Sequence, residues 1–449
     1  AQVGVVDMVS MLDLKNALFE GGVVGAGGAG FPTHAKLSDQ ADTVILNCAE
    51  CEPLIKVDRQ LMVDYINEIL SGMQMMVEAM GAKEGIIAVK KSYTASIEAV
   101  KSNIGNYKNL RLHILPDIYP AGDEVVLIYE TTGRIVPQGK IPILVGCVVC
   151  NVETVLNIYQ KVTSDTNVVN KFVTVAGLVK KPVTVKVPVG VTVKELIDMA
   201  GGVSTEEYVP LMGGPMTGRI CGLNDVVTKT TKALLILPPN CLPIRKRQSS
   251  PKMDIRNAMS VCSQCSMCTS LCPRNLLGQS IAPNVFMRAI ANGLTYDVEP
   301  FLNSFFCCSC GLCEMYSCHQ GLSPRRLLDQ YKGALRAKGV RVPDKPGKGV
   351  ADPMRDERRV PEHRLITRLG LAGFDVPAPM TEITSVKEVK LMLRQNIGAP
   401  CVPSVKVGDT VSVGQKIAAP PEGALGTCLH ASIAGTVTAV TDNFVSIKA

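Results

Sequence analysis

The sequence predicts an α/β protein of several domains, and three observations lead to this fold class. Residues 13–152 alternate strand and helix patterns, which is typical of a Rossmann-like, mainly parallel sheet. Short β-rich segments fill residues 172–238 and 400–449, which indicates a small β-grasp-like domain and a small terminal β-sandwich or barrel. A cysteine-rich segment, residues 254–336, separates the two. The length of 449 residues exceeds that of one hydrophobic core, so about two to four domains are expected.

The N-terminal alternation surrounds a glycine-rich loop. A helix over residues 13–20 runs into this loop at residues 21–30, and a buried strand follows at 43–47. The pattern then continues as helix, strand, helix and strand over residues 59–80, 85–89, 92–104 and 110–115. Because ligands bind beyond the carboxyl ends of parallel strands, the loop that follows Asn47 is a candidate site.

The charge of the chain argues against a nucleic-acid partner. The formal net charge is +7, and residues 323–368 hold 13 Lys and Arg against 6 Asp and Glu. This basic stretch contains one aromatic residue, Tyr331, and no recognisable nucleic-acid motif, so a solvated face or a docking surface for an acidic redox partner is favoured.

No stretch reaches the roughly 18 apolar residues that span a bilayer. We therefore expect no membrane span and a cytoplasmic location.

The first cysteine run has the spacing of a bacterial ferredoxin. It reads Cys262-x2-Cys265-x2-Cys268-x3-Cys272-Pro273. Three thiolates at this spacing wrap one face of a cubane, and the fourth, turned away by the proline, reaches the other cluster of a two-cluster fold. A structural zinc site is the alternative, but such sites use two separated C-x-x-C pairs. The run therefore predicts [4Fe-4S] ligands.

A second run departs from this pattern by one inserted residue and by His319 in place of proline. Its cysteines are Cys307, Cys308, Cys310, Cys313 and Cys318. Cys307 keeps the two-residue gap to Cys310, so it is preferred to Cys308. The crossing rule predicts one cluster on Cys262, Cys265, Cys268 and Cys318 and the other on Cys272, Cys307, Cys310 and Cys313. An expected helix at residues 284–292 favours a helical version of the two-cluster ferredoxin fold.

The glycine loop offers backbone N–H groups that no side chain obstructs, which is a common way to seat a phosphate. Taken alone it is equally compatible with a tight turn. Four motifs in order are more specific: GAGGAGFPTHAK at 25–36, NCAECEP at 47–53, YPAGDE at 119–124 and NVET at 151–154. Together they resemble the FMN- and NADH-binding flavoprotein subunit of respiratory NADH:quinone oxidoreductase. They are still more similar to RnfC, the peripheral flavoprotein-like component of Rnf electron-transport complexes.

This resemblance implies an FMN site and an NADH site. The residues it places in cofactor binding are Gly25, Gly27, Gly28, Lys36, Asn47, Glu50, Gly122, Asp123, Glu124, Asn151 and Thr154. Lys36 is expected at the flavin phosphate, and Phe31 and Glu124 are the expected catalytic residues at the nicotinamide. The respiratory pattern has Arg where Ala26 stands and Asp where Ala49 stands. A scaffold that carries electrons but has lost NADH binding therefore stays open as an alternative.

The remaining domains resemble the same families. Residues 166–240 are similar to the SLBB β-grasp domain, and residues 386–449 to the barrel-sandwich hybrid domain that RnfC proteins carry at their N-terminus. Its C-terminal position here resembles the cobalamin reductases of propanediol-utilisation microcompartments, over nearly the whole chain. The expected domains are residues 13–165 (FMN and NADH), 166–240 (SLBB), 254–336 (two clusters), 337–385 (a linking or wrapping segment) and 386–449 (hybrid domain).

The resemblance implies an NADH-dependent oxidoreductase. Electrons would pass from NADH through FMN and two [4Fe-4S] clusters to an acceptor, expected to be cobalamin, free or held by an adenosyltransferase. The expected location is inside a bacterial microcompartment, with a shell protein and a second copy of the chain as further partners. The rivals are an Rnf-type module that exchanges electrons with a ferredoxin, and the non-catalytic scaffold.

Overall fold

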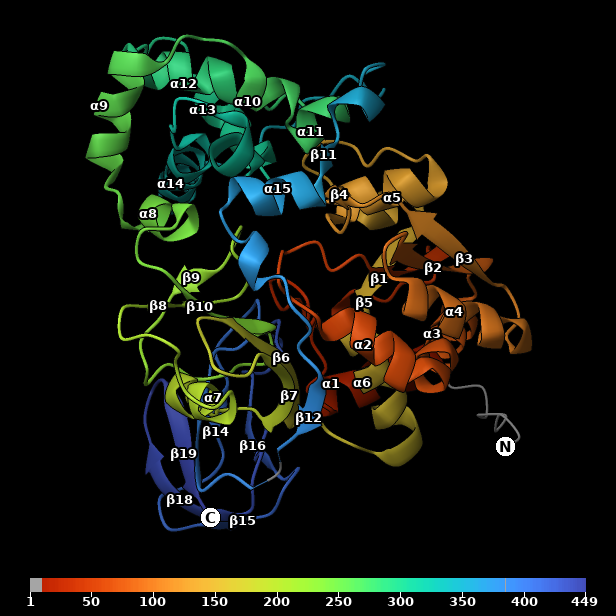
Figure 1. Ribbon diagram of the computed structural model, residues 1–449. Coiled ribbons are helices and arrows are strands. Elements are labelled where there is room, and N and C mark those ends of the chain that lie inside the picture. The colour runs from red at the N-terminus through yellow and green to blue at the C-terminus, as the bar shows by residue number, and fades with distance from the viewer. Residues whose placement is uncertain (1–9, 384) are drawn as a thin grey trace.

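The computed structural model describes residues 10–383 and 385–449 (Figure 1). In Figure 1 the N-terminal α/β domain lies at the right, and the cysteine-rich helices lie at the top. The two β domains lie below the helices, with the C-terminal one at the bottom. Within the described residues, the structure contains no helix long and apolar enough to cross a membrane.

The N-terminal domain is built on a four-stranded parallel sheet with the order β3-β2-β1-β5. Val44 and Leu46 of β1 face one core with the helices of that side, and Ile45 faces a second core with α5. The expected parallel sheet with helices on both faces is therefore confirmed. Its strands are β1 (Thr43–Cys48), β2 (Glu84–Lys90), β3 (Leu110–Leu115) and β5 (Cys147–Asn151). Its helices are α1 (Met11–Glu20), α2 (Val57–Asp64), α3 (Ile66–Met80), α4 (Thr94–Asn103), α5 (Glu124–Thr132) and α6 (Val152–Ser164).

One sequence-based expectation about helices is wrong. The predicted helix over residues 59–80 is two helices, because Tyr65 leaves the helical conformation (φ −126°, ψ 31°) and packs its ring edge-on against Phe172. The segment at residues 240–252, between the β-grasp and cysteine-rich domains, is largely helical, as α8 (Leu242–Gln248) and the start of α9 (Pro251–Val261). Both helices have a proline in the first turn, where its missing N–H costs no hydrogen bond.

The β-grasp domain has a six-stranded sheet with the order β12-β7-β6-β10-β8-β9. Its central strands β6 and β10 are parallel, and β7 is antiparallel to β6. The edge strand β12 comes from the later wrapping segment. The elements are β6 (Asn170–Gly177), β7 (Val183–Pro188), α7 (Val193–Met199), β8 (Val209–Met212), β9 (Arg219–Ile220), β10 (Ala233–Leu237) and β12 (Met380–Glu382).

The cysteine-rich domain is helical, with a small core of its own around Phe286, Leu327 and Leu328. The predicted helix at residues 284–292 is observed as α12 (Pro283–Ala291). The other helices are α10 (Met267–Ser270), α11 (Pro273–Leu276), α13 (Glu299–Leu302) and α14 (Pro324–Ala337). After α14 the chain returns to the N-terminal domain, where β11 (Val360–Pro361) pairs with β4 (Ile118–Tyr119) and leads into α15 (Glu362–Arg368).

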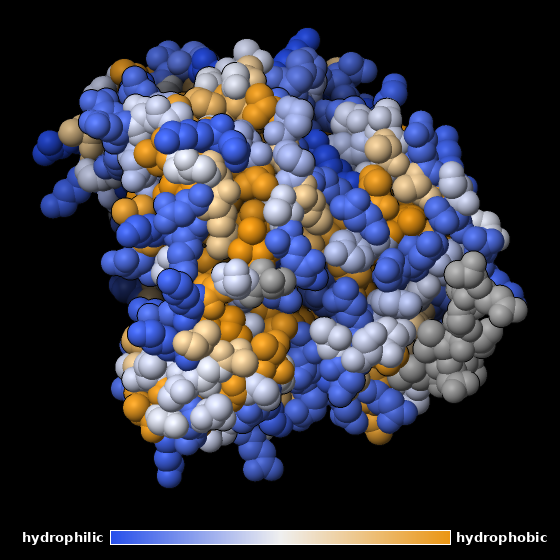
Figure 2. Space-filling view, turned by 60° about the horizontal axis from the view of Figure 1, so that its bottom comes forward, coloured by the Kyte–Doolittle hydropathy of each residue, from blue (hydrophilic) through white to orange (hydrophobic). Residues whose placement is uncertain are grey.

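The C-terminal domain contains two small sheets, with the orders β13-β19-β18-β15 and β14-β16-β17. Its apolar residues share one core with the β-grasp domain, so the two β domains pack as a unit. On the face that Figure 2 shows, exposed apolar residues are interspersed with polar ones. The strands are β13 (Glu388–Met392), β14 (Val402–Pro403), β15 (Thr410–Val411), β16 (Lys416–Ala419), β17 (Leu429–His430), β18 (Gly435–Val440) and β19 (Phe444–Lys448).

Candidate functional site

The glycine loop lies between α1 and β1 and is held by hydrogen bonds on both sides of Ala26. The Ala26 N–H donates to Thr154 Oγ1 (2.9 Å), and the Ala26 carbonyl accepts from Lys171 Nζ (3.1 Å). A Cβ on Gly27 would come within 2.8 Å of Asn151 Nδ2, whereas a Cβ on Gly28 would meet nothing within 4 Å. The loop is therefore packed against α6 at Gly27 and open at Gly28.

A second set of predicted residues meets at the carboxyl end of β1. Asn47 Nδ2 donates to the Gly122 carbonyl (3.0 Å), and Asn47 Oδ1 accepts from the Ala49 N–H (3.0 Å). A Cβ on Gly122 would lie 3.2 Å from Cys51 Sγ, so this position has little space for a side chain. The structure thus brings together Asn47, near the end of β1, and Gly122, which lies 75 residues further along the chain.

Asn151 and Glu50 are tied to the start of α2. The Asn151 side chain caps α6 by accepting from the Glu153 N–H, and its Nδ2 donates to Asp58 Oδ2 (2.8 Å). The buried Glu50 accepts from the Asp58 N–H (2.8 Å). Burial and the nearby Asp58 carboxylate raise the pKa of Glu50 above that of an exposed glutamate. The Glu50 carboxylate is thus anchored to α2.

Lys36 and Glu124 form an ion pair of 2.7 Å at the rim of the site. Burial alone would lower the pKa of Lys36, but the facing Glu124 carboxylate more than offsets this and raises it, so Lys36 carries a fixed positive charge. The predicted nicotinamide residues are accessible, since Phe31 is 39% exposed and the Glu124 side chain 37%. An accessible cation and an open glycine loop fit the phosphate of a flavin nucleotide.

Four cysteines line one cavity, which we call the outer cysteine cavity: Cys262, Cys265, Cys268 and Cys318. Cys265 is exposed. Two of the sulfurs accept hydrogen bonds, Cys262 Sγ from Gln264 Nε2 (3.2 Å) and Cys318 Sγ from the Leu322 N–H (3.3 Å). Burial raises the pKa of the Cys268 thiol to about 12, so a thiolate there requires a bound metal. Four convergent sulfurs from two separate runs suit the donor set of an iron-sulfur cluster.

Five cysteines line a second cavity, the inner cysteine cavity: Cys272, Cys307, Cys308, Cys310 and Cys313. Cys272 belongs to the first cysteine run but lines this cavity with the cysteines of the second run. The crossing of the fourth cysteine to the other cluster has this arrangement. Cys307 Sγ accepts from the Ser309 N–H (3.3 Å). Both Cys307 and Cys308 line the cavity, so the preference for Cys307 stays a prediction.

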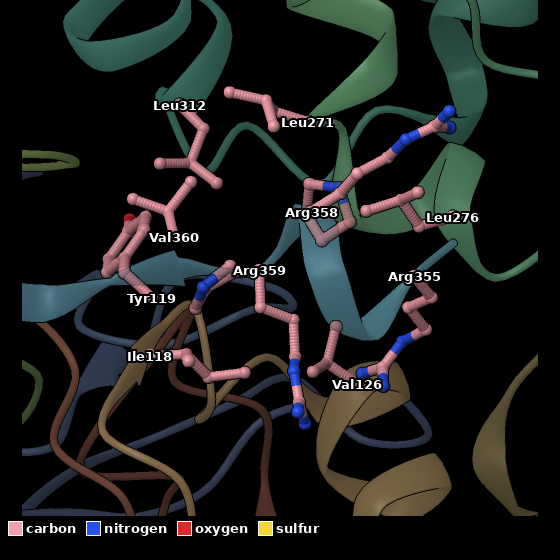
Figure 3. A pocket seen from close by; sticks show the side chains of 12 residues that line it. Ile118, Tyr119, Val126, Leu271, Leu276, Leu312, Arg355, Arg358, Arg359 and Val360 are labelled. Atoms are coloured by element: carbon pink, nitrogen blue, oxygen red, sulfur yellow. The ribbon is translucent and has the colours of Figure 1, made fainter. Parts of the chain in front are cut away.

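The inner cysteine cavity is joined to the flavin site by two contacts. The Tyr119 hydroxyl donates to the Cys310 carbonyl (2.7 Å), and Arg274 Nη2 pairs with Asp123 Oδ2 (2.8 Å). Tyr119 and Asp123 belong to the YPAGDE motif, and Arg274 follows Cys272 by two residues. Figure 3 shows the narrow cavity beside this junction, which three parts of the chain line. The N-terminal domain contributes Ile118, Tyr119 and Val126, and the cysteine-rich domain contributes Leu271, Leu276 and Leu312. The segment that returns from the cysteine-rich domain contributes Arg355, Arg358, Arg359 and Val360.

Sequence reasoning missed several residues of this arrangement. Lys171, Lys232, Asp58 and Arg274 lie in no motif, and local pattern gives no signal for them. Lys171 lies on β6 and Lys232 directly precedes β10 in the β-grasp domain, and a lysine at either kind of position is normally interpreted as solvent-facing. Only their burial, at 1% and 8% exposure, distinguishes them.

Comparisons with known proteins agree with the arrangement of the domains. Family models match the Nuo51 FMN-binding domain at residues 18–160 and the SLBB domain at 172–220. They also match a 4Fe-4S dicluster domain at 261–323 and the RnfC barrel-sandwich hybrid domain at 376–448.

Curated relatives align with nearly the whole chain. The cobalamin reductase PduS of Salmonella typhimurium is 42% identical over 97% of this chain and 96% of its own length. The chain belongs to the PduS family. The Citrobacter freundii member is also 42% identical, over 95% of this chain and 94% of its own. One component of the Na(+)-translocating ferredoxin:NAD(+) oxidoreductase complex of Acetobacterium woodii is 34% identical over 60% of this chain and 59% of its own length. This family member is a flavin and iron-sulfur oxidoreductase with FMN and two [4Fe-4S] clusters as its cofactors.

Proposed function

We propose that the protein passes electrons from NADH through FMN and the two clusters to cobalamin. The observation that carries this proposal is the order of the sites: the flavin loops touch the inner cysteine cavity, and the outer cavity reaches the surface at Cys265. When bound, FMN accepts a hydride as an electron pair and releases the electrons singly, and each cluster carries one electron. The 42% identity to two cobalamin reductases supports cobalamin as the acceptor.

The residues of the chain have distinct roles in this proposal. The glycine loop and Lys36 would hold the flavin phosphate, and Lys36, now paired with Glu124, would then supply its charge to the phosphate. Glu124 and the accessible Phe31 would face the nicotinamide nucleotide. Tyr119 and Arg274 fix the inner cavity against the flavin loops. The sulfurs predicted to bind the clusters are Cys262, Cys265, Cys268 and Cys318 for the outer one, and Cys272, Cys307, Cys310 and Cys313 for the inner one.

The test is an anaerobic assay with the FMN- and iron-loaded protein, NADH and hydroxocobalamin, followed by the absorbance change of the corrin ring. We expect NADH oxidation and cobalamin reduction together. Glu124→Gln should depress both cobalamin reduction and the reduction of a small dye that meets the flavin directly. The double variant Cys265→Ala/Cys310→Ala should keep dye reduction and lose cobalamin reduction.

Three results would contradict the proposal. Cobalamin reduction at the wild-type rate by the cluster-free double variant would mean that the flavin donates directly. A flavin that a chemical reductant bleaches but NADH does not would favour the non-catalytic scaffold. Reduction of a ferredoxin in preference to cobalamin would favour an Rnf-type role, as the name of the Acetobacterium woodii complex describes it.

The proposed setting is a bacterial microcompartment, on the ground of the similarity to PduS proteins over nearly the whole chain. An adenosyltransferase that binds the reduced cobalamin is the proposed partner. Co-purification of the tagged chain with such an enzyme and with shell proteins from the native host would test this. Recovery of the chain with membrane subunits instead would contradict it.

A further inference from the structure

The β-grasp domain inserts two buried lysines beneath the flavin site. Lys171 lies on β6, and Lys232 directly precedes β10, the strand that pairs with β6. Figure 1 shows the β-grasp strands beside α1 and α6 of the N-terminal domain. Lys171 Nζ pairs with Glu153 of α6, and Lys232 Nζ with Asp58 of α2. Burying four charged side chains is costly unless each is paired, and here each lysine of the β-grasp domain is paired with a carboxylate of the N-terminal domain.

Lys171 determines which way one peptide of the glycine loop points. Its ammonium group can only donate hydrogen bonds, and it donates to the Ala26 carbonyl (3.1 Å) as well as to Glu153. A trans peptide is planar, with its carbonyl and N–H on opposite sides. Because the Ala26 carbonyl accepts from Lys171, the Gly27 N–H points to the opposite side of this peptide, away from Lys171. Within the described residues, no oxygen accepts from the N–H of Gly27 or Gly28.

Lys232 is connected to the glycine loop through Asp58 and Asn151. It pairs with Asp58 Oδ1, and Asp58 Oδ2 accepts from Asn151 Nδ2 (2.8 Å). The Asn151 amide lies directly beneath Gly27, where a Cβ would approach it to 2.8 Å. The position of the Asn151 amide is thus set by a residue of another domain.

We propose that Lys171 and Lys232 are positioning residues for FMN, so that the β-grasp domain completes the flavin site by orienting the Gly27 N–H toward the cofactor. This inference rests on the FMN site of the proposed function. It predicts that the flavin affinity of the N-terminal domain depends on side chains that do not contact the flavin. The paired charges also give the β-grasp domain a fixed orientation on the flavin domain.

The experiment measures FMN affinity in the full-length chain after FMN depletion, from the quenching of FMN fluorescence on titration. The variants Lys171→Met/Glu153→Gln and Lys232→Met/Asp58→Asn each remove both charges of a pair, so that no buried charge is left alone. Lys180→Met, an exposed lysine of the same domain, is the matched control. We expect the dissociation constant to rise at least tenfold in both double variants and to stay unchanged in the control.

Two further measurements separate positioning from loss of fold. Iron content and melting temperature should stay at wild-type values in both double variants. At saturating FMN, the visible absorption bands of the flavin should shift in Lys171→Met/Glu153→Gln, because a hydrogen-bond donor to the cofactor has moved. An unchanged dissociation constant would overturn the inference, as would weaker binding accompanied by loss of iron and a lower melting temperature. A wild-type chain that binds no FMN would instead refute the proposed flavin site itself.

Discussion

The ion pair between Asp123 and Arg274 is one of two direct contacts between the flavin loops and the cysteine-rich domain, and substitutions can remove it without removing a helix cap. Asp123 Oδ2 binds Arg274, while its Oδ1 caps α5 by accepting from the N–H groups of Val125 and Val126. Asparagine caps a helix about as well as aspartate, so Asp123→Asn removes the charge and keeps the cap. Arg274→Gln removes the other partner.

The magnitude follows from burial. The side chains of Asp123 and Arg274 are 12% and 17% exposed. Breaking a fully buried pair costs about 3–5 kcal/mol, and partial exposure places this pair near about 2–3 kcal/mol. For a folding unit of about 150–250 residues, a loss of about 2–3 kcal/mol lowers the melting temperature by about 4–12 °C. Asp123→Ala should lose about 1 kcal/mol more, because the cap is lost as well.

The assay is thermal unfolding of the cluster-loaded protein with excess FMN under anaerobic conditions, followed by circular dichroism. In a double-mutant cycle, Asp123→Asn/Arg274→Gln should be hardly less stable than either single variant, since one change already breaks the pair. The coupling free energy should therefore be about 2 kcal/mol, within the range measured for residues in contact. Single effects that add to within about 0.5 kcal/mol would refute the pair as an energetic link between the two domains.

Four other outcomes are expected. Anaerobically purified protein should contain about eight iron and eight sulfide per chain, as two cubanes require, and about four of each by chemical analysis would show that the second run does not assemble. Cys265→Ala should lose one cluster and keep FMN, and joint loss of iron and flavin would contradict the domain split. Gly27→Ala should weaken FMN binding in the fluorescence titration, because its Cβ would displace the Asn151 amide 2.8 Å away, and Gly105→Ala, with nothing within 4 Å, is the control. Burial lowers the pKa of Lys229 to about 8, against 10.5 for an exposed lysine, so above pH 8 this residue binds more protons in the unfolded chain and its contribution to stability rises with pH. Urea unfolding should show that Lys229→Met removes about 2 kcal/mol of the rise between pH 8 and 10, and an identical rise in the variant would contradict this.

Local sequence was sufficient for features that depend on neighbours along the chain. The alternation of buried strands and helices gave the parallel sheet, because a strand covered on both faces is buried along most of its length and apolar at its centre, as β1 is. The spacing of the cysteines and Pro273 led to two predicted ligand sets, and the cysteines of each set line one cavity, together with Cys308 in the inner one. Sequence failed at Tyr65, where a tertiary contact with Phe172 interrupts a helix whose apolar spacing is otherwise regular.

The sequence by itself therefore determined the order of the domains, the glycine loop and the cysteine runs, because each is a short-range pattern of spacing. Only the tertiary structure decided how these parts act on one another. The contacts of Lys171 with Ala26, of Lys232 with Asp58 and of Arg274 with Asp123 join residues 145, 174 and 151 positions apart. A charged side chain in a sequence is normally interpreted as solvent-exposed, because burial removes the water that hydrates its charge. These three are largely buried because a partner from another domain replaces that hydration, and no local pattern encodes the partner.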